Sequence, residues 1–214
     1  MDITGKKLCV LGDSITQGAG LERGEDLFWK VLEQEQGLRQ AVGYGIGGTR
    51  IARQTTERDD LAADSCFSYR YRLMEDDADI VLVFGGTNDY GHGDAPMGGM
   101  ADRCEDTFYG ACHCLLSGLL DKYPDAVILV ATPLHRADEA ALNPFTHLGL
   151  EDYVRALKQT AAYYSLPLLD FYSMSGIQPA HPACRERLCP DGIHPNARGH
   201  RLLAQRLAGF LRAL

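Results

Sequence analysis

Short apolar runs alternate along the chain with longer stretches in which apolar residues recur at helical spacing. The apolar runs predict strands at residues 7–11, 40–44, 79–84, 126–131 and 166–171. The amphipathic stretches predict helices at residues 26–36, 102–122, 150–164 and 197–212. A strand–helix unit that repeats about five times predicts a parallel sheet with helices on both faces.

Length and charge narrow the class of protein. The chain has 214 residues, of which 45% are hydrophobic and 23% are charged, as is usual for a globular protein. Because chains tend to split into domains above roughly 250 residues, we expect residues 1–214 to form a single domain. The net charge of −8 argues against binding to nucleic acid, which needs a basic patch, and against docking on anionic membranes.

The N-terminal segment does not predict a signal peptide, because its apolar run is short and Gly12-Asp13 interrupts it. No stretch approaches the roughly 20 apolar residues of a membrane span. We therefore expect a cytoplasmic protein without stable membrane association; the sequence makes no prediction of its oligomeric state. Its seven cysteines are then expected to be reduced thiols, and only an oxidising setting would allow Cys184 to pair with Cys189.

The residues that follow each strand carry the candidate chemistry, because ligands of such sheets bind beyond the carboxyl ends of the strands. Gly12-Asp13-Ser14 follows the first strand and opens a helix, where free N–H groups favour negative charge developing near Ser14. A serine hydroxyl is a weak nucleophile and needs a base. Ser and Asp also cap helices, so this segment alone fits a plain N-cap nearly as well.

A base and its orienting group are predicted near the C-terminus. Asp191 precedes His194 by three residues in a loop that contains Gly192 and Pro195. In such a loop the carboxylate can hold one ring nitrogen, which leaves the other to accept a proton from Ser14. Taken alone, the same pattern also fits a turn followed by a helix cap.

Two glycine-rich segments follow the second and third strands. In Gly85-Gly86-Thr87-Asn88-Asp89, the Asn88 amide can face a reacting carbonyl oxygen, although an Asx-type turn would use the same residues. In the segment at residues 43–49, glycines allow a backbone N–H to approach a ligand, although a flexible turn without a ligand is the better interpretation of this segment taken alone.

Together these segments resemble the SGNH (GDSL-type) hydrolase family. GDSITQG at residues 12–18 is similar to the family's first block, GYGIGGT at residues 43–49 to its second, GGTND at residues 85–89 to its third, and DGIHP at residues 191–195 to its fifth. The blocks occur in the family's order and span almost the whole chain. With this resemblance, the fold prediction is an α/β protein, a flavodoxin-like three-layer α/β/α sandwich with a five-stranded parallel sheet.

The resemblance implies a role for individual residues. Ser14 is expected to be the nucleophile, His194 its base and Asp191 the group that orients the base. The oxyanion hole is expected to consist of the Ser14 N–H, the Gly48 N–H and the Asn88 amide. No metal and no cofactor are implied.

This chain departs from the family pattern at one position. The family often has Asn five residues before the second-block glycine, and here that residue is Gly43. The departure leaves the choice of Gly48, over Gly45 or Gly47, less firmly determined by the sequence.

Gly43-x-Gly45-x-x-Gly48 also matches the dinucleotide fingerprint G-x-G-x-x-G, with Asp64 near the distance expected for a ribose contact. That fingerprint should follow the first strand and open a helix, whereas here it follows the second. Residues 51–64 are also too polar for the strand that should end at the acid. A dinucleotide-dependent enzyme is therefore the remote alternative.

A second alternative is a binding module that has kept the fold without the chemistry, since fold alone does not imply activity. Against it, each predicted catalytic position holds the expected type of residue. The histidines at His92, His135 and His147 are scattered in loops without the spacing of a zinc site.

The predicted reaction is two-step acyl transfer to water through an acyl-enzyme on Ser14. We expect a small-molecule ester with a short acyl group, such as acetyl, on a polar or carbohydrate-like alcohol, because no long apolar lid is evident. Lysophospholipase or thioesterase activity is the alternative. Candidate substrate contacts are Asp13, Tyr90, His92 and His135.

Overall fold

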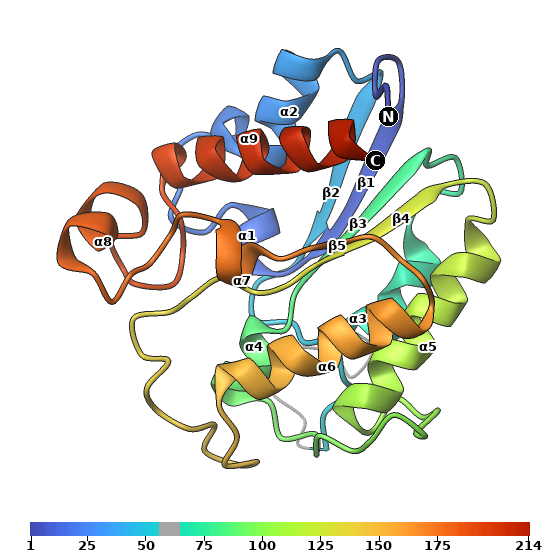
Figure 1. The fold of residues 1–214 in the computed structure, drawn as a ribbon, viewed down its shortest axis with the longest axis vertical. Helices are drawn as coiled ribbons and strands as arrows, with labels where there is room; N and C mark the ends of the chain where they lie inside the picture. Colours follow the sequence, from blue (N-terminus) through green and yellow to red (C-terminus); the bar gives the residue numbers. More distant parts are fainter. Residues whose placement is uncertain (56–64) are drawn as a thin grey trace.

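The computed structural model describes residues 1–55 and 65–214. Five parallel strands form one sheet in the order β2-β1-β3-β4-β5. Their bounds are β1 (Lys7–Gly12), β2 (Gln40–Gly45), β3 (Ile80–Phe84), β4 (Val127–Ala131) and β5 (Leu168–Leu169). Helices cover both faces of the sheet (Figure 1), so the predicted three-layer α/β/α fold is confirmed.

The two faces of the sheet bury two separate apolar cores. Because successive strand residues point to opposite faces, Leu8 and Val10 of β1 pack on one side and Cys9 and Leu11 on the other. The first side is covered by α2 (Phe28–Gln36) and α9 (Ala197–Ala213). The second side is covered by α3 (Phe67–Arg70), α5 (Phe108–Lys122) and α6 (Leu150–Tyr163).

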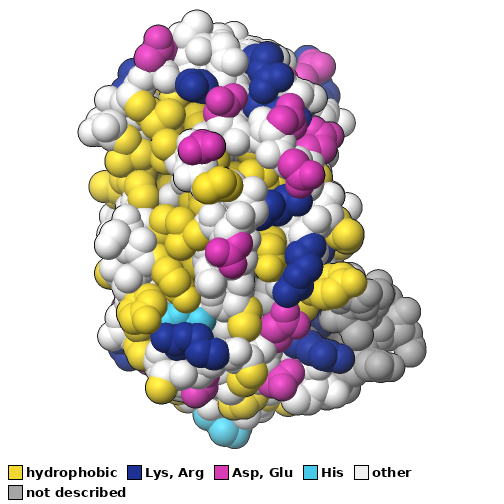
Figure 2. Space-filling model, turned by 90° about the vertical axis from the view of Figure 1, so that its right-hand side faces the viewer, with side chains coloured by type: hydrophobic (Ala, Val, Ile, Leu, Met, Phe, Trp, Pro, Cys, Tyr) yellow, Lys and Arg dark blue, Asp and Glu magenta, His cyan; other side chains and the backbone are white. Residues whose placement is uncertain are grey.

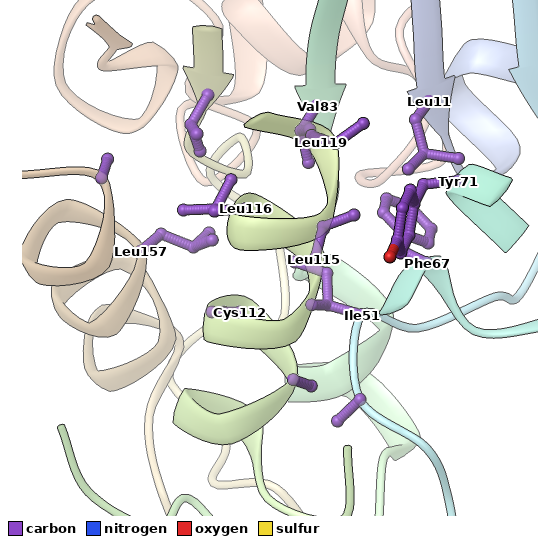
Figure 3. Packing of buried hydrophobic residues seen from close by; sticks show 14 of the residues in the cluster. Leu11, Ile51, Phe67, Tyr71, Val83, Cys112, Leu115, Leu116, Leu119 and Leu157 are labelled. Carbon is purple, nitrogen blue, oxygen red and sulfur yellow. The ribbon is translucent and has the colours of Figure 1, made fainter. Parts of the chain in front are cut away.

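Helix α5 fills the centre of the second core. Figure 3 shows Leu116 of α5 lying toward Leu157 of α6, while Leu115 lies toward Phe67 of α3. These side chains are almost completely buried. Full burial of one such side chain contributes roughly 1.5–3 kcal/mol, so this packing fixes the helices against the sheet and thereby fixes the strand ends.

The structure corrects the start of one predicted helix. Helix α5 begins at Phe108 and not at residue 102. The Thr107 side chain caps it by accepting a hydrogen bond from the Gly110 N–H at 3.1 Å. The Asp102 carboxylate accepts from the Gly99 N–H at 3.0 Å and from the Thr107 hydroxyl at 2.9 Å, which holds the preceding residues in a turn.

The fifth strand is shorter than predicted, because only Leu168 and Leu169 pair with β4 instead of residues 166–171. Pro167 has no backbone N–H for the ladder. Asp170 begins α7 (Phe171–Met174), and its side chain accepts from the Ser173 N–H at 3.4 Å. The capping residue thus ends the strand.

Several short helices occupy the connections between the long elements. The pattern of apolar residues did not predict them, because helices of seven residues or fewer have no detectable periodicity, although the segment Gly12-Asp13-Ser14 is expected to open a helix. They are α1 (Ser14–Gln17), η1 (Gly24–Asp26), η3 (Tyr71–Leu73), α4 (Thr87–His92) and α8 (Pro182–Leu188).

On the face of the molecule seen in Figure 2, hydrophobic side chains gather along one side, and acidic and basic side chains intermingle along the other. Within residues 1–55 and 65–214, no helix combines the length and apolar character needed to cross a membrane. All seven cysteines, including Cys184 and Cys189, are free thiols.

Candidate active site

Ser14 is the first residue of α1, directly beyond the carboxyl end of β1. The Asp13 carboxylate caps this helix by accepting a hydrogen bond from the Ile15 N–H at 3.0 Å. A Cβ atom at Gly12 would lie 1.9 Å from the Thr16 hydroxyl oxygen, so only glycine permits the tight turn from strand to helix. This turn aims the Ser14 side chain out of the sheet edge.

The three side chains predicted to act together are in hydrogen-bond contact. The Ser14 Oγ lies 2.9 Å from His194 Nε2. On the other side of the ring, His194 Nδ1 lies 2.6 Å from Asp191 Oδ2. The imidazole thus bridges a hydroxyl and a carboxylate, as a general base requires.

The Asp191 carboxylate is held in its charged form. Burial alone would raise its pKa, but hydrogen bonds from the backbone N–H groups of His194 and Ile193, together with the imidazole, outweigh burial and hold the pKa below its ordinary value. The two N–H groups donate to Oδ1 at 2.7 and 2.8 Å. An ionised carboxylate here favours a proton on Nδ1 and leaves Nε2 free to accept one.

A left-handed glycine shapes the loop that carries these residues. Gly192 has a φ of +87°, and its carbonyl accepts a hydrogen bond from the Ala137 N–H at 2.9 Å. The Gly192 N–H donates to the Cys189 carbonyl at 2.9 Å. The loop is therefore fixed to the segment that follows β4.

The structure distinguishes three glycines at the end of β2 and in the loop after it, among which the sequence could not choose. A Cβ at Gly45 would lie 2.3 Å from the backbone nitrogen of Gln17, so this residue allows α1 to approach. The Gly47 N–H donates to Gln17 Oε1 at 2.7 Å. Gly48 has a φ of +74°, and its N–H has no hydrogen-bond partner in the described part of the chain. The Gly48 N–H, unlike the Gly47 N–H, therefore remains available to a substrate oxygen, and the close contact of Gly45 with α1 gives that glycine a packing role.

Asn88 lies on the first turn of α4, directly beyond β3. Its side chain is 8% exposed, and its Nδ2 donates to the Thr49 carbonyl at 2.9 Å. A side-chain amide has two N–H groups, so one remains for a ligand. This bond links Asn88 to the residue after Gly48.

A buried arginine that the sequence did not single out joins the strand ends. Arg70 Nη2 donates to the Gly12 carbonyl at 2.6 Å and to the Thr49 hydroxyl at 2.9 Å, and Nη1 donates to the Tyr44 carbonyl at 2.6 Å. Burial lowers the pKa of this guanidinium to about 10, against the opposing effect of the Asp13 charge, so it remains charged at neutral pH.

Asp89, next to Asn88, has a similar bracing role. Its carboxylate accepts hydrogen bonds from the Ile51 N–H at 2.9 Å and the Ala52 N–H at 3.0 Å. Burial raises its pKa to about 6 in spite of these bonds. Asn143 Nδ2 then donates to three carbonyl groups of residues 89–93, at 2.7–3.0 Å. Asp89 belongs to the GGTND segment, where no role is predicted for it, and Asn143 has no sequence signal.

Two of the predicted substrate contacts are buried. Asp13 is 1% exposed, and burial raises its pKa to about 6, against the effects of the Ile15 N–H and His194. Tyr90 is 3% exposed, and its hydroxyl donates to the carbonyls of Asp138 and Ala141. Such burial argues for roles in positioning the backbone rather than in direct contact.

The other two predicted contacts are partly accessible. His92 Nδ1 lies 3.0 Å from Arg50 Nη1. His135 Nδ1 lies 2.9 Å from both carboxylate oxygens of Glu139, and its ring lies 3.9 Å from the Tyr172 ring between centroids. Their contact with substrate stays a prediction.

The structure lacks the helix that dinucleotide binding would require after the glycine-rich segment. The fingerprint requires a helix N-terminus at the pyrophosphate, and residues 46–55 form no helix. Asp64, the predicted ribose contact, lies outside the described residues. Among the residues that are described, no group of three or more His, Cys, Asp or Glu side chains is arranged to hold a metal ion.

Comparison with known proteins identifies the family of this chain. Residues 10–202 match the GDSL-like lipase/acylhydrolase family. The chain belongs to this family. The GDSL hydrolase is 28% identical over 219 residues to a GDSL lipase of Mycobacterium tuberculosis, with 95% of this chain and 80% of the relative covered. The family membership predicted from the four blocks is confirmed, and the hydrolase is a carboxylic ester hydrolase.

Solved structures support the same assignment of fold. The hydrolase is similar to a protein from Lactobacillus plantarum, with a TM-score of 0.86 and 32% identity over 98% of each chain. An acetyl xylan esterase shares the fold with a TM-score of 0.62 and 21% identity, over 95% of this chain and 98% of the other.

Proposed function

We propose that residues 1–214 form a single serine hydrolase domain in which Ser14 is the nucleophile, His194 the general base and Asp191 the group that orients the base. The observation that carries this proposal is the continuous hydrogen-bonded chain from Ser14 Oγ to His194 Nε2, at 2.9 Å, and from His194 Nδ1 to Asp191 Oδ2, at 2.6 Å. Both distances lie within the range required of a nucleophile and its base.

In the first step, Ser14 Oγ attacks the ester carbonyl carbon while His194 Nε2 takes the hydroxyl proton. Asp191 remains ionised and stabilises the imidazolium. The carbonyl oxygen becomes an oxyanion, which we place among the Ser14 N–H, the Gly48 N–H and the second N–H of Asn88. The Ser14 N–H is at the first position of a helix, where no intrahelical acceptor exists.

Collapse of this intermediate breaks the bond to the alcohol, which leaves with the proton from His194. Water then attacks the Ser14 ester, gives its proton to His194, and the acid leaves as Ser14 regains its proton. The cycle is complete without a metal or a cofactor, and its substrate is a small-molecule ester.

We further propose a short acyl group, such as acetyl, on a polar or carbohydrate-like alcohol. Residues 132–149, which follow β4, contain no helix and are fixed by buried side chains. Asn143 donates to three carbonyls beside α4, and Arg136 Nη1 donates to the Thr87 carbonyl at 3.1 Å. A loop held this way acts as a wall and not as an apolar lid over a fatty chain.

One observation favours the second candidate, a lysophospholipase or thioesterase. Leu142 and Phe145 of the same loop are 61% and 59% exposed. Exposed apolar side chains at the rim of a site can contact a longer acyl chain.

The deciding experiment compares wild type, Ser14→Ala and the control Ser117→Ala, an exposed serine of α5, on aryl esters from acetyl to decanoyl. We expect Ser14→Ala to lose at least about 10⁴-fold in kcat with unchanged thermal unfolding, and Ser117→Ala to match wild type. Wild-type activity that falls steeply beyond butyryl supports the short-acyl proposal, and activity that rises with chain length supports the second candidate. Full activity in Ser14→Ala would refute the nucleophile, and a wild type inactive on every ester would favour a binding module.

A further inference from the structure

A pocket of about 500 Å³ lies beyond the carboxyl ends of β4 and β5. Its volume is within the range of small-molecule sites, and its place at the strand ends is where such folds bind ligands. It is lined by the loop after β4, the first turns of α6 and the chain around α7, including Ala137, Glu139, Ala140, Glu151, Asp152 and Tyr172.

One wall of this pocket is in direct contact with the loop of the proposed triad. The Ala137 N–H donates to the Gly192 carbonyl at 2.9 Å, and Gly192 follows Asp191 in the chain. A Cβ at Gly192 would lie 2.6 Å from the Ala137 side chain, so the two segments are in close contact. The wall of the pocket therefore adjoins the loop that carries Asp191 and His194.

The polar lining consists of acceptors that are already held in place. Glu139 accepts from His135 Nδ1 at 2.9 Å and from the Arg136 N–H at 3.1 Å. Asp152 accepts from the Gly149 N–H at 2.9 Å and from Arg155 at 3.0 Å. A carboxylate has about four lone-pair positions, so each can still accept hydrogen bonds from a ligand.

The remaining lining is apolar, with Tyr172 as its largest member. The Tyr172 ring packs against the His135 ring at a tilt of 35°, and its hydroxyl donates to Glu151 at 3.3 Å, so the ring is held by two contacts. A fixed aromatic ring beside several acceptors suits a ligand with both C–H faces and hydroxyl groups. An anion is disfavoured, because three carboxylates face one cation, Arg155, which is itself paired with Asp152.

We propose that this pocket is the subsite for the alcohol part of the substrate, and that this part is a polyhydroxylated ring such as a monosaccharide. The hydroxyl groups would donate to Glu139, Glu151 and Asp152, and a C–H face would pack on Tyr172. This inference rests on the proposed function, because it supplies the alcohol of the ester that Ser14 would cleave.

Binding is tested first, without catalysis. Isothermal titration of the Ser14→Ala protein with a mono-O-acetyl methyl glucoside should give heat of binding. Adding Tyr172→Ala, or Ala140→Trp to fill the pocket from an exposed position, should weaken the affinity at least about tenfold. Tyr163→Ala, an exposed tyrosine at the other end of α6, should leave the affinity unchanged. The subsite would be overturned if the glucoside does not bind or binds equally to all variants. It would also be overturned if the pocket prefers tetramethylammonium, an organic cation that the three carboxylates and the aromatic ring would attract.

Steady-state kinetics then distinguish a loss of alcohol binding in the pocket from a loss of catalysis at Ser14. With Ser14 present, Tyr172→Ala and Ala140→Trp should lower kcat/KM on the acetylated glucoside at least about tenfold, mainly through KM, and leave hydrolysis of methyl acetate, whose alcohol is too small to fill the pocket, unchanged. Equal losses on both esters would show damage to the triad loop and contradict the subsite. Failure of the proposed function has a different signature, since hydrolysis of methyl acetate would then not depend on Ser14.

Discussion

The Asn88 amide has two N–H groups, and only one of them is needed to hold the Thr49 carbonyl. The same bond fixes the side chain, so the second N–H keeps one direction before any substrate binds. A donor oriented in advance stabilises charge without reorganising during the reaction, which is the main requirement of an oxyanion hole.

Replacing Asn88 by Ala should therefore lower kcat on an aryl acetate roughly 10²–10³-fold. The free energy of unfolding should also fall by about 1–3 kcal/mol, because the buried Thr49 carbonyl loses its hydrogen-bond donor. Steady-state kinetics and thermal unfolding of the same preparations measure both effects. Asn143→Ala is the informative comparison, since that amide braces α4 without a proposed place in the oxyanion hole. A near-normal kcat in a folded Asn88→Ala protein would remove the residue from the site.

At Gly43 the chain departs from the pattern common in its family, and the structure gives a reason. A Cβ at this position would lie 2.6 Å from the Trp29 ring, whose Nε1 donates to the Thr16 carbonyl at 3.0 Å. The indole thus occupies the space that a side chain at residue 43 would need. It ties α2 to α1, two residues beyond Ser14.

At the scale of elements, Arg70 joins segments that are far apart in sequence. From the end of α3 it reaches the last residue of β1, the penultimate residue of β2 and the Thr49 side chain. A planar guanidinium can hold several acceptors in one fixed geometry, whereas an ammonium group is a single point donor. Arg70 therefore fixes the spacing between the Ser14 turn and the loop that carries Gly48.

Arg70→Lys should keep the positive charge but lose the fixed spacing between the Ser14 turn and the loop that carries Gly48. We expect kcat on an aryl acetate to fall about tenfold or more with little change in KM, because the oxyanion donors move relative to Ser14. Arg72→Lys, at a partly exposed arginine paired with Glu105, should behave as wild type. If Arg70→Lys loses only thermal stability and keeps its kcat, Arg70 supports the fold and does not position the site.

At the scale of the whole molecule, burial of ionisable groups links stability to pH. His200 on α9 is fully buried, and its Nδ1 accepts from the Phe28 N–H at 3.2 Å. Burial, together with the nearby His194, lowers its pKa from 6.5 to about 4. Between these values the unfolded chain binds a proton that the folded protein excludes, so this group reduces stability as the pH falls from about 6.5 to about 4.

His200→Gln retains an acceptor for Phe28 and removes the titration. The stability of wild type relative to this variant should decrease by about 2 kcal/mol between pH 7.5 and pH 5. Denaturant unfolding of both proteins at the two pH values gives this difference. The comparison is necessary because Asp13 and Asp89, whose pKa values are raised to about 6, change stability in the opposite direction over a similar range. An unchanged difference between the two proteins would mean that His200 titrates normally in the folded state.

The sequence alone determined the layers of the fold and the segments that carry its chemistry. Apolar runs and amphipathic stretches are local patterns, and they located the long helices and the buried strands to within a few residues. Where a local polar contact competed with the pattern, as at Asp102 before α5 and Asp170 after β5, the predicted boundary was wrong. The four blocks identified the family because each is a contiguous run of residues.

Only the tertiary structure decided how these segments meet. Gly45, Gly47 and Gly48 are equivalent in sequence, and they became distinct because Gln17 and α1 pack against the first two. Arg70 and Asn143 carry no motif, since their importance comes from backbone carbonyls that belong to distant segments. The pocket beside Gly192 likewise combines residues from α6, α7 and the loop after β4. Contacts between distant residues depend on how the packed helices and strands bring chain ends together, and no local pattern encodes that arrangement.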